Sequence, residues 1–206
     1  MSETALDFLV AAVGAGQESA GVQLSARADV SHINLRGRVD DTGLMSAATR
    51  VLGHPLPTEP NTFNGTTTRT FWMGPDEWHI ITDRSAPDLV SALGANSGSP
   101  NGACNDVSGG YVYLELTGED TADVLAKGCT LDLHPQVFKP GTCAQTNLAK
   151  CAVLIARPDR QDTFELLVRR SFAEYACLWL TQAARQCGWS LRIQNEAQSR
   201  VSSQHS

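Results

Sequence analysis

Two acidic residues and a histidine lie close together where the chain has the sequence WMGPDEWHI (72–80). Asp76, Glu77 and His79 are residue types suited to general acid/base catalysis, because a carboxylate can accept a proton and an imidazole titrates near neutral pH. The same pattern is typical of a β-hairpin turn in which the aspartate bonds backbone amides and the histidine faces outward. The turn is the favoured interpretation, because apolar residues alternate with His79.

Other candidate residues are scattered. Cys104 and Asp106 form a second possible acid/base pair. His54 and His134 each precede a proline, and imidazole is a common metal ligand. No cysteine or further histidine stands near either one, so no metal site is predicted.

The cysteines show no CxxC motif and no zinc-like spacing. We predict that they are reduced, and several lie in apolar runs as small core residues. The six positions are Cys104, Cys129, Cys143, Cys151, Cys177 and Cys187.

Motifs of nucleotide binding and acyl transfer are absent from the sequence. Gly14 and Gly16 lack the preceding strand and the third glycine of the GxGxxG fingerprint. Neither a Walker A motif nor a GxSxG elbow occurs. We therefore predict no catalytic, cofactor-binding or metal-binding residue in this chain.

A strand followed by a helix is the unit from which the chain is built. Residues 112–116 alternate apolar and polar, which predicts a half-buried strand. Thr117 and Asp120 resemble a helix N-cap pair, a helix follows, and Gly128 is a plausible stop.

The same unit occurs twice, over residues 34–62 and 115–142. The matching positions are Leu35 and Leu116, Gly37 and Gly118, His54 and His134, Pro60 and Pro140, and Thr62 and Thr142. Chance agreement at turn residues is the alternative to a duplication. The ordered matches predict an α+β fold of two pseudo-repeated, ferredoxin-like (split βαβ) lobes, related by a pseudo-twofold axis.

The remaining elements follow from periodicity and turn residues. Strands are predicted at 30–36, 67–73, 78–82, 103–107, 150–157, 163–169 and 189–193, helices at 41–52, 86–93 and 171–187, and a flexible loop at 94–102. Ser171 and Glu174 suggest a capping box for the longest helix. Its predicted buried stripe is Phe172, Tyr175, Ala176, Trp179, Ala183 and Cys187, with Trp179 largely buried.

The domain organisation is predicted as three parts. Residues 1–20 form an N-terminal docking segment, whose helix (4–13) is too short to be stable alone and is expected to dock on a partner subunit. Residues 21–195 form one domain of two lobes, about 21–106 and 107–195. Residues 196–206 are polar and expected to be disordered.

Composition narrows the class of protein. A net charge of −6 argues against a nucleic-acid partner, which requires a basic face. No apolar stretch is long enough to span a membrane. The apolar run at 6–13 has no preceding Lys or Arg, unlike a secretory signal, so a cytoplasmic protein is expected.

Four segments together resemble a known family: NLRG (34–37), LGHPLPTEPNT (52–62), WMGPDEWHI (72–80) and DVSGGYVYLELTGEDTADVLAKGC (106–129). They are similar to the gamma subunit of heterotetrameric sarcosine oxidase and to gamma-type subunits of N-methylglutamate and dimethylglycine dehydrogenases. The strand–glycine–helix units more distantly resemble the aminomethyltransferase (glycine-cleavage T-protein) fold.

The resemblance implies a non-catalytic subunit in an oxidoreductase complex with alpha, beta and delta partners. Such a complex converts sarcosine to glycine, with formaldehyde or methylenetetrahydrofolate and hydrogen peroxide. FAD, FMN, NAD, tetrahydrofolate and zinc are then expected on the partner subunits. The alternatives are a gamma-type subunit of a related N-methylglutamate or dimethylglycine dehydrogenase, and a stand-alone folate-binding, aminomethyltransferase-like protein. Trp72, Met73 and Trp78 are candidate subunit-interface residues, since interfaces concentrate such side chains.

Overall fold

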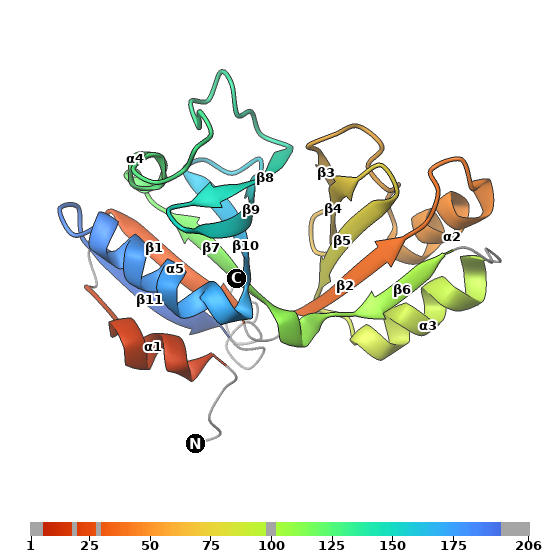
Figure 1. The fold of residues 1–206 in the computed structure, drawn as a ribbon, viewed down its shortest axis with the longest axis horizontal. Helices are drawn as coiled ribbons and strands as arrows, with labels where there is room; N and C mark the ends of the chain where they lie inside the picture. The colour runs from red at the N-terminus through yellow and green to blue at the C-terminus, as the bar shows by residue number, and fades with distance from the viewer. Residues whose placement is uncertain (1–5, 18–19, 28–29, 98–101, 195–206) are drawn as a thin grey trace, which may run out of the picture. The chain divides into compact units, whose positions relative to one another are not determined.

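The structure, a computed structural model, describes residues 6–17, 20–27, 30–97 and 102–194. The chain forms two compact units, each with its own sheet (Figure 1). Unit 2 comprises Val30–Gly109 and Gly141–Ala144, and unit 1 comprises Met1–Asp29, Gly110–Pro140 and Gln145–Ser206. In the described residues, no helix is long and apolar enough to cross a membrane.

Unit 2 is built on a five-stranded sheet with the order β3-β4-β5-β2-β6. Its elements are β2 (Ser31–Arg36), α2 (Thr42–Leu52), β3 (Phe63–Asn64), β4 (Arg69–Gly74), β5 (Glu77–Thr82), α3 (Ala86–Ser97) and β6 (Ala103–Asp106). The pairs β2–β5, β2–β6 and β4–β5 are antiparallel. The order β6-β2-β5-β4 is therefore that of a split βαβ unit, with β3 added at the edge.

Alternation along the strands of unit 2 separates a helix-covered face from a second face. Ile33 and Leu35 of β2 lie beside Trp78 and Ile80 of β5 in the core. Helices α2 and α3 complete that core with Leu44, Ala48, Leu52, Ala86, Leu89 and Leu93. The alternating residues His32, Asn34, Glu77 and His79 consequently lie on the other face.

Unit 1 contains a six-stranded sheet with the order β11-β1-β7-β10-β9-β8. Its elements are α1 (Asp7–Val13), β1 (Val22–Arg27), β7 (Tyr111–Thr117), α4 (Thr121–Ala126), β8 (Thr142–Leu148), β9 (Cys151–Arg157), β10 (Thr163–Arg169), α5 (Arg170–Ala183) and β11 (Trp189–Gln194). The first three residues of β8 are assigned to unit 2. A short 3₁₀ helix, η1 (Ser108–Gly110), precedes β7. Helix α5 packs on β7 and β10 and also contacts α1 and α4.

The order of elements confirms the predicted α+β repeat. Strand, helix, strand, hairpin, helix and strand follow one another from β2 to β6 and again from β7 to β11. The third element differs in length, because β3 has two residues and β8 has seven. Both sheets also keep the same neighbours, except that unit 1 has β1 between β7 and β11. The pseudo-twofold axis stays a prediction.

The N-terminal strand β1 is the main departure from the expected organisation. The lobe expected over 21–106 contributes residues 22–27 to the other sheet, where β1 pairs parallel to β11 and antiparallel to β7. Val22, Leu24 and Ala26 are fully buried there, which explains why the strand belongs to unit 1.

Helix α1 begins at Asp7 and packs on α5 and β11 of its own chain. Leu6 and Leu9 are buried by that contact, and the Arg170 guanidinium lies 5.4 Å from the centre of the Phe8 ring. The argument for docking on a partner subunit is therefore removed, because this chain itself covers the helix.

The longest helix, α5, shows that the predicted buried stripe is wrong in phase. Phe172 is 45% exposed, whereas the buried residues of the helix are Ala173, Ala176, Cys177, Leu180 and Thr181. Of these five, Ala176 alone belongs to the predicted stripe. Trp179 is only half-buried. The Ser171–Glu174 capping box is also not formed, because the helix begins at Arg170 and its N-cap Arg169 makes no side-chain cap bond. Small side chains, instead of the aromatic ones, bring α5 close to the sheet.

Two segments were expected to be irregular, a loop and a C-terminal tail. The loop expected over 94–102 is shorter, because α3 continues to Ser97 and β6 begins at Ala103. The expected disordered tail, 196–206, lies outside the described residues.

Candidate functional site

The β4–β5 hairpin does not bring its acid/base candidates together. Asp76 is exposed in the turn, and its backbone carbonyl accepts a hydrogen bond from the Gly37 amide at 3.1 Å. The Glu77 carboxylate accepts bonds from Asn34 Nδ2 at 2.7 Å and Arg36 Nη2 at 2.9 Å. Glu77 is thus held in an ion pair on the sheet, and Asp76 lies in the hairpin turn, as predicted. The turn contact of Asp76 is made by its backbone carbonyl, whereas bonds from its carboxylate to backbone amides were expected.

His79 is buried, contrary to the outward position expected from the hairpin. It is 1% exposed, and its Nε2 lies 3.2 Å from Nδ1 of His32, which is 2% exposed. One imidazole must donate and the other accept, so the short contact requires that they are not both protonated. Burial lowers the pKa of His32 to about 4, although the negative charge of Asp106 acts in the opposite direction.

His32 was missed in the sequence analysis, although a pattern pointed to it. Alternation about Ile33 and Leu35 assigns His32 to the same face as Asn34. Only the antiparallel register, with Asn34 opposite His79, brings the two imidazoles together. That register depends on long-range pairing, which a local pattern does not specify.

Cys104 and Asp106 lie on the edge strand β6 and are engaged separately. Burial raises the pKa of the Cys104 thiol to about 11, so it is protonated and weakly nucleophilic at neutral pH. Asp106 Oδ1 accepts bonds from the Ser108 hydroxyl at 2.6 Å and the Ser108 amide at 2.9 Å. These bonds lower the pKa of Asp106 and make it a capping residue for the following turn.

The two histidines that precede prolines, His54 and His134, each have their own local hydrogen-bond partner. His54 Nε2 lies 3.0 Å from Thr70 Oγ1, and burial lowers its pKa. His134 is exposed, and its Nδ1 accepts a bond from the Gln136 amide at 3.3 Å. Across the described residues, no group of three or more His, Cys, Asp or Glu side chains is placed to hold a metal ion.

All six cysteines lie in the described part of the chain and carry free thiols. Burial raises the pKa of Cys143 and of Cys177 to about 12. The prediction of reduced cysteines therefore agrees with the structure, and the core position holds for Cys143, Cys151 and Cys177.

The candidate interface residues behave differently from one another. Trp78 is fully buried in unit 2, where its indole Nε1 donates to the Pro57 carbonyl at 2.8 Å. Its assignment to an interface is wrong, because the chain's own core encloses it. Trp72 and Met73 on β4 are half-buried, so their role at an interface stays a prediction.

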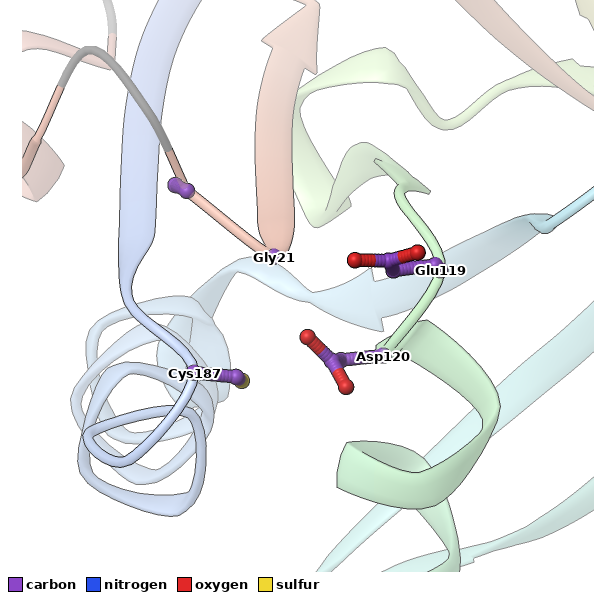
Figure 2. Close-up of a pocket in the computed structure, with 5 residues that line it drawn as sticks. Gly21, Glu119, Asp120 and Cys187 are labelled. Atoms are coloured by element: carbon purple, nitrogen blue, oxygen red, sulfur yellow. The ribbon is translucent and has the colours of Figure 1, made fainter.

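A hollow of about 460 Å³ in unit 1 is lined by Ala20, Gly21, Glu119, Asp120 and Cys187. Figure 2 shows the Glu119 and Asp120 carboxylates beside the turn into α4, with the Cys187 side chain directed towards Asp120. Burial and the neighbouring Asp120 charge raise the pKa of Cys187, so this thiol is not activated as a nucleophile.

The geometry around Gly21 gives this hollow a structural explanation. A Cβ at Gly21 would lie 2.0 Å from Asp120 Oδ2, and one at Gly118 would lie 2.1 Å from the Gly21 carbonyl oxygen. Gly118 also has a φ of +124°, which favours glycine. The two glycines therefore allow the residue before β1 to approach the β7–α4 turn closely, and the Glu119 and Asp120 carboxylates line the hollow beside this contact.

A second hollow, of about 430 Å³, surrounds the β4–β5 turn in unit 2. The two arginines that line it are each paired with a carboxylate: Arg36 with Glu77, and Arg38 with Asp40 at 2.5 Å. Since these pairs satisfy the arginines, the hollow is not organised as an anion site.

Comparison with known proteins provides the identification. A family model described as "Sarcosine oxidase, gamma subunit family" matches residues 36–186. The chain belongs to the sarcosine oxidase gamma subunit family. It is 32% identical over 179 residues to the sarcosine oxidase subunit gamma of Corynebacterium sp. strain P-1, covering 86% of this chain and 87% of that protein. The corresponding Arthrobacter subunit is 32% identical over 182 residues, covering 86% and 87%.

Two solved structures have folds similar to that of this chain. A chain of the heterotetrameric sarcosine oxidase from Corynebacterium sp. U-96, in complex with pyrrole 2-carboxylate, matches with a TM-score of 0.80 and 29% identity. The match covers 90% of this chain and 95% of that one. The aminomethyltransferase T of Bartonella henselae matches with a TM-score of 0.60 and 13% identity, covering 84% of this chain and 48% of that chain. This second likeness concerns the fold alone and confirms the predicted fold class.

Proposed function

We propose that this chain is the gamma subunit of a heterotetrameric sarcosine oxidase and supports that assembly by contact, with no catalytic residue of its own. The observation that carries the proposal is the match to a chain of a heterotetrameric sarcosine oxidase over 95% of that chain's length. Sequence identities of 32% to named gamma subunits give independent support.

The positions of the candidate acid/base residues support a contact role. Asp76 is exposed in a turn, Glu77 is engaged by Asn34 and Arg36, and His79 is buried beside His32. A general acid or base must reach the proton that it transfers, directly or through one water. These three side chains do not face one common hollow.

The proposal extends to the partners and the cofactors. Alpha, beta and delta subunits would complete the complex in the cytoplasm, and FAD, FMN, NAD, tetrahydrofolate and zinc would lie on them. The lack of a GxGxxG fingerprint in this sequence is consistent with flavin and NAD binding elsewhere. The complex would oxidise sarcosine to glycine, with formaldehyde or methylenetetrahydrofolate and hydrogen peroxide as the other products.

Co-expression of this chain with the proposed alpha, beta and delta subunits tests the proposal. The tagged chain should co-elute with them, and Asp76→Asn should leave sarcosine turnover per assembled complex within about threefold, since general acid/base catalysis contributes about 10²–10⁴-fold. Asp123→Asn on α4, another exposed carboxylate, is the matched control. A hundredfold loss for Asp76→Asn in an intact complex would contradict a purely structural role. A chain that elutes alone and binds tetrahydrofolate would favour the aminomethyltransferase-like alternative.

A further inference from the structure

The outer side of α5 carries large apolar side chains where a surface helix usually carries charged ones. By the 3.6-residue period, the residues on this side are Ser171, Phe172, Tyr175, Leu178, Trp179 and Gln182, none of which is charged. Phe172 and Leu178 are 45% and 44% exposed, and Tyr175 and Trp179 are half-buried. We call Phe172, Tyr175, Leu178 and Trp179 the apolar face of α5.

This face is unusual within the protein. Among the described residues, the exposed large hydrophobic side chains are Val39, Val137, Phe172 and Leu178, so two of the four lie on this one helix. The charged residues of α5, Arg170 and Glu174, lie to one side of the apolar face. Depletion of charge together with an excess of aromatic residues is the composition of an interface core.

The apolar face is also held in place. The Trp179 ring lies against Gly128, where a Cβ would come within 2.4 Å of it. At the C-terminal end of α5, Lys127 Nζ donates to the Ala183 carbonyl at 2.7 Å. At the N-terminal end, the Arg170 guanidinium lies over the Phe8 ring of α1. Figure 1 shows α1 alongside α5. A helix fixed at both ends pays little conformational entropy when another surface packs on it.

The chain itself offers no counterpart for this face. The segments outside the described residues are MSETA (1–5), the short stretches at 18–19, 28–29 and 98–101, and NEAQSRVSSQHS (195–206), and they are predominantly polar. The structural relative is a chain of a heterotetramer, which indicates an unlike chain in preference to a second copy. We propose that the apolar face of α5 is the docking surface for another subunit of the complex, one that presents an uncharged, apolar surface; this rests on the proposed function.

The test introduces charge into the face without disturbing the core. Phe172→Asp and Leu178→Asp, singly and together, are made in the full chain and co-expressed with the partner subunits. Val137→Asp is the matched control, because Val137 is 61% exposed and lies outside α5. Association is measured by co-elution and titration, and folding of the full chain by circular dichroism and melting temperature. If an aspartate variant does not fold, association is measured with Phe172→Ala and Leu178→Ala instead.

The double aspartate variant should bind its partners at least about thirtyfold more weakly, as expected for loss of interface hot spots, while Val137→Asp binds normally. If the α5 variants fold like the wild type and bind the partner subunits with unchanged affinity, the inference is overturned and the proposed function stays intact. Failure of the wild-type chain to co-elute would instead contradict the proposed function. A wild-type chain that dimerises alone, and becomes monomeric with the α5 substitutions, would identify a second copy as the occupant and overturn the inference.

Discussion

At the scale of single residues, the buried contact between His32 and His79 makes the stability of unit 2 depend on pH. Both rings are almost inaccessible, and the ring centres are 5.4 Å apart. In the described sheet, β6 lies on the other side of β2 from β5 and brings Asp106 near His32. The His32 amide donates a hydrogen bond to the hydroxyl of Ser108, the first residue of η1, at 3.0 Å. A buried imidazole is neutral in the folded chain but takes up a proton readily once the chain unfolds.

We therefore expect unit 2 to lose stability as the pH falls. The pKa of His32 is about 4 in the folded chain and about 6.5 when unfolded, so the unfolded state binds more protons between these values. The stability present above pH 6.5 is lost as the pH falls towards 4, by roughly 2 kcal/mol at pH 5. Denaturant unfolding at pH 7 and pH 5 would measure this loss, and His32→Gln should reduce the pH dependence.

His134→Gln, the same substitution at an exposed position of unit 1, is the control for this prediction. NMR titration of the His32 ring gives a direct check. A ring that titrates near 6.5 in the folded protein would show that the pair does not behave as a buried, neutral group.

At the scale of secondary-structure elements, local chemistry specified α2 correctly. Its buried residues Leu44, Ala47, Ala48 and Leu52 follow the helical period. The helix begins after Asp41, whose Oδ1 accepts a bond from the Leu44 amide at 3.0 Å, and ends at Gly53 with a φ of +81°. Both ends are determined by neighbouring residues, so they could be predicted without knowledge of the tertiary structure.

Asp41→Ala should accordingly destabilise unit 2 by about 1 kcal/mol, because it leaves the Leu44 amide without its cap. Asp40→Ala is the control: Asp40 is exposed and pairs only locally with Arg38, so a smaller change is expected. Thermal unfolding of both variants provides the measurement. Equal effects of the two substitutions would mean that the cap contributes nothing specific.

Helix α5 and strand β1 show two limits of prediction from the sequence. For α5 the sequence did not determine which side is buried, and for β1 a pattern was present but was not interpreted. Apolar size predicted a stripe centred on Trp179, whereas Ala173, Cys177 and Leu180, which lay outside that stripe, are buried. Periodicity identifies a helix, but its phase against the sheet depends on packing between distant segments. Strand β1 carried a usable pattern, because Val22, Leu24 and Ala26 alternate with polar residues. Its insertion between β7 and β11 nevertheless requires contacts with the far end of the chain.

At the scale of the whole molecule, the repeat predicted two similar lobes, and the candidate site was less predictable than the fold. The order of strands and helices depends on local patterns that duplication preserves. The burial of His79 and Trp78 and the pairing of Glu77 depend on register and on side chains from other strands. The sequence predicted the hairpin carrying these residues but not their surroundings.

The position of β1 makes unit 1 depend on the first part of the chain. In the described sheet, β11 is an edge strand whose neighbour is β1, and β1 also pairs with β7. Removal of residues 1–27 therefore detaches β11 and exposes the apolar residues that β1 covers. Burial of one Val or Leu side chain contributes about 1.5–3 kcal/mol, so losing two of them alone approaches the roughly 5–15 kcal/mol stability of a domain.

A chain lacking residues 1–27 should lose the cooperative unfolding of unit 1 while β2 and β5 of unit 2 stay protected. A chain lacking residues 1–14 removes α1 but keeps β1, so its six-stranded sheet should persist with reduced stability from the loss of Leu6 and Leu9. Amide hydrogen exchange distinguishes the two, because it reports each strand separately. Fast exchange throughout β11 and β7 is expected in the longer deletion and slow exchange in the shorter one. Slow exchange of β11 amides without residues 1–27 would mean that β11 finds another partner, and that β1 is not required to close the sheet.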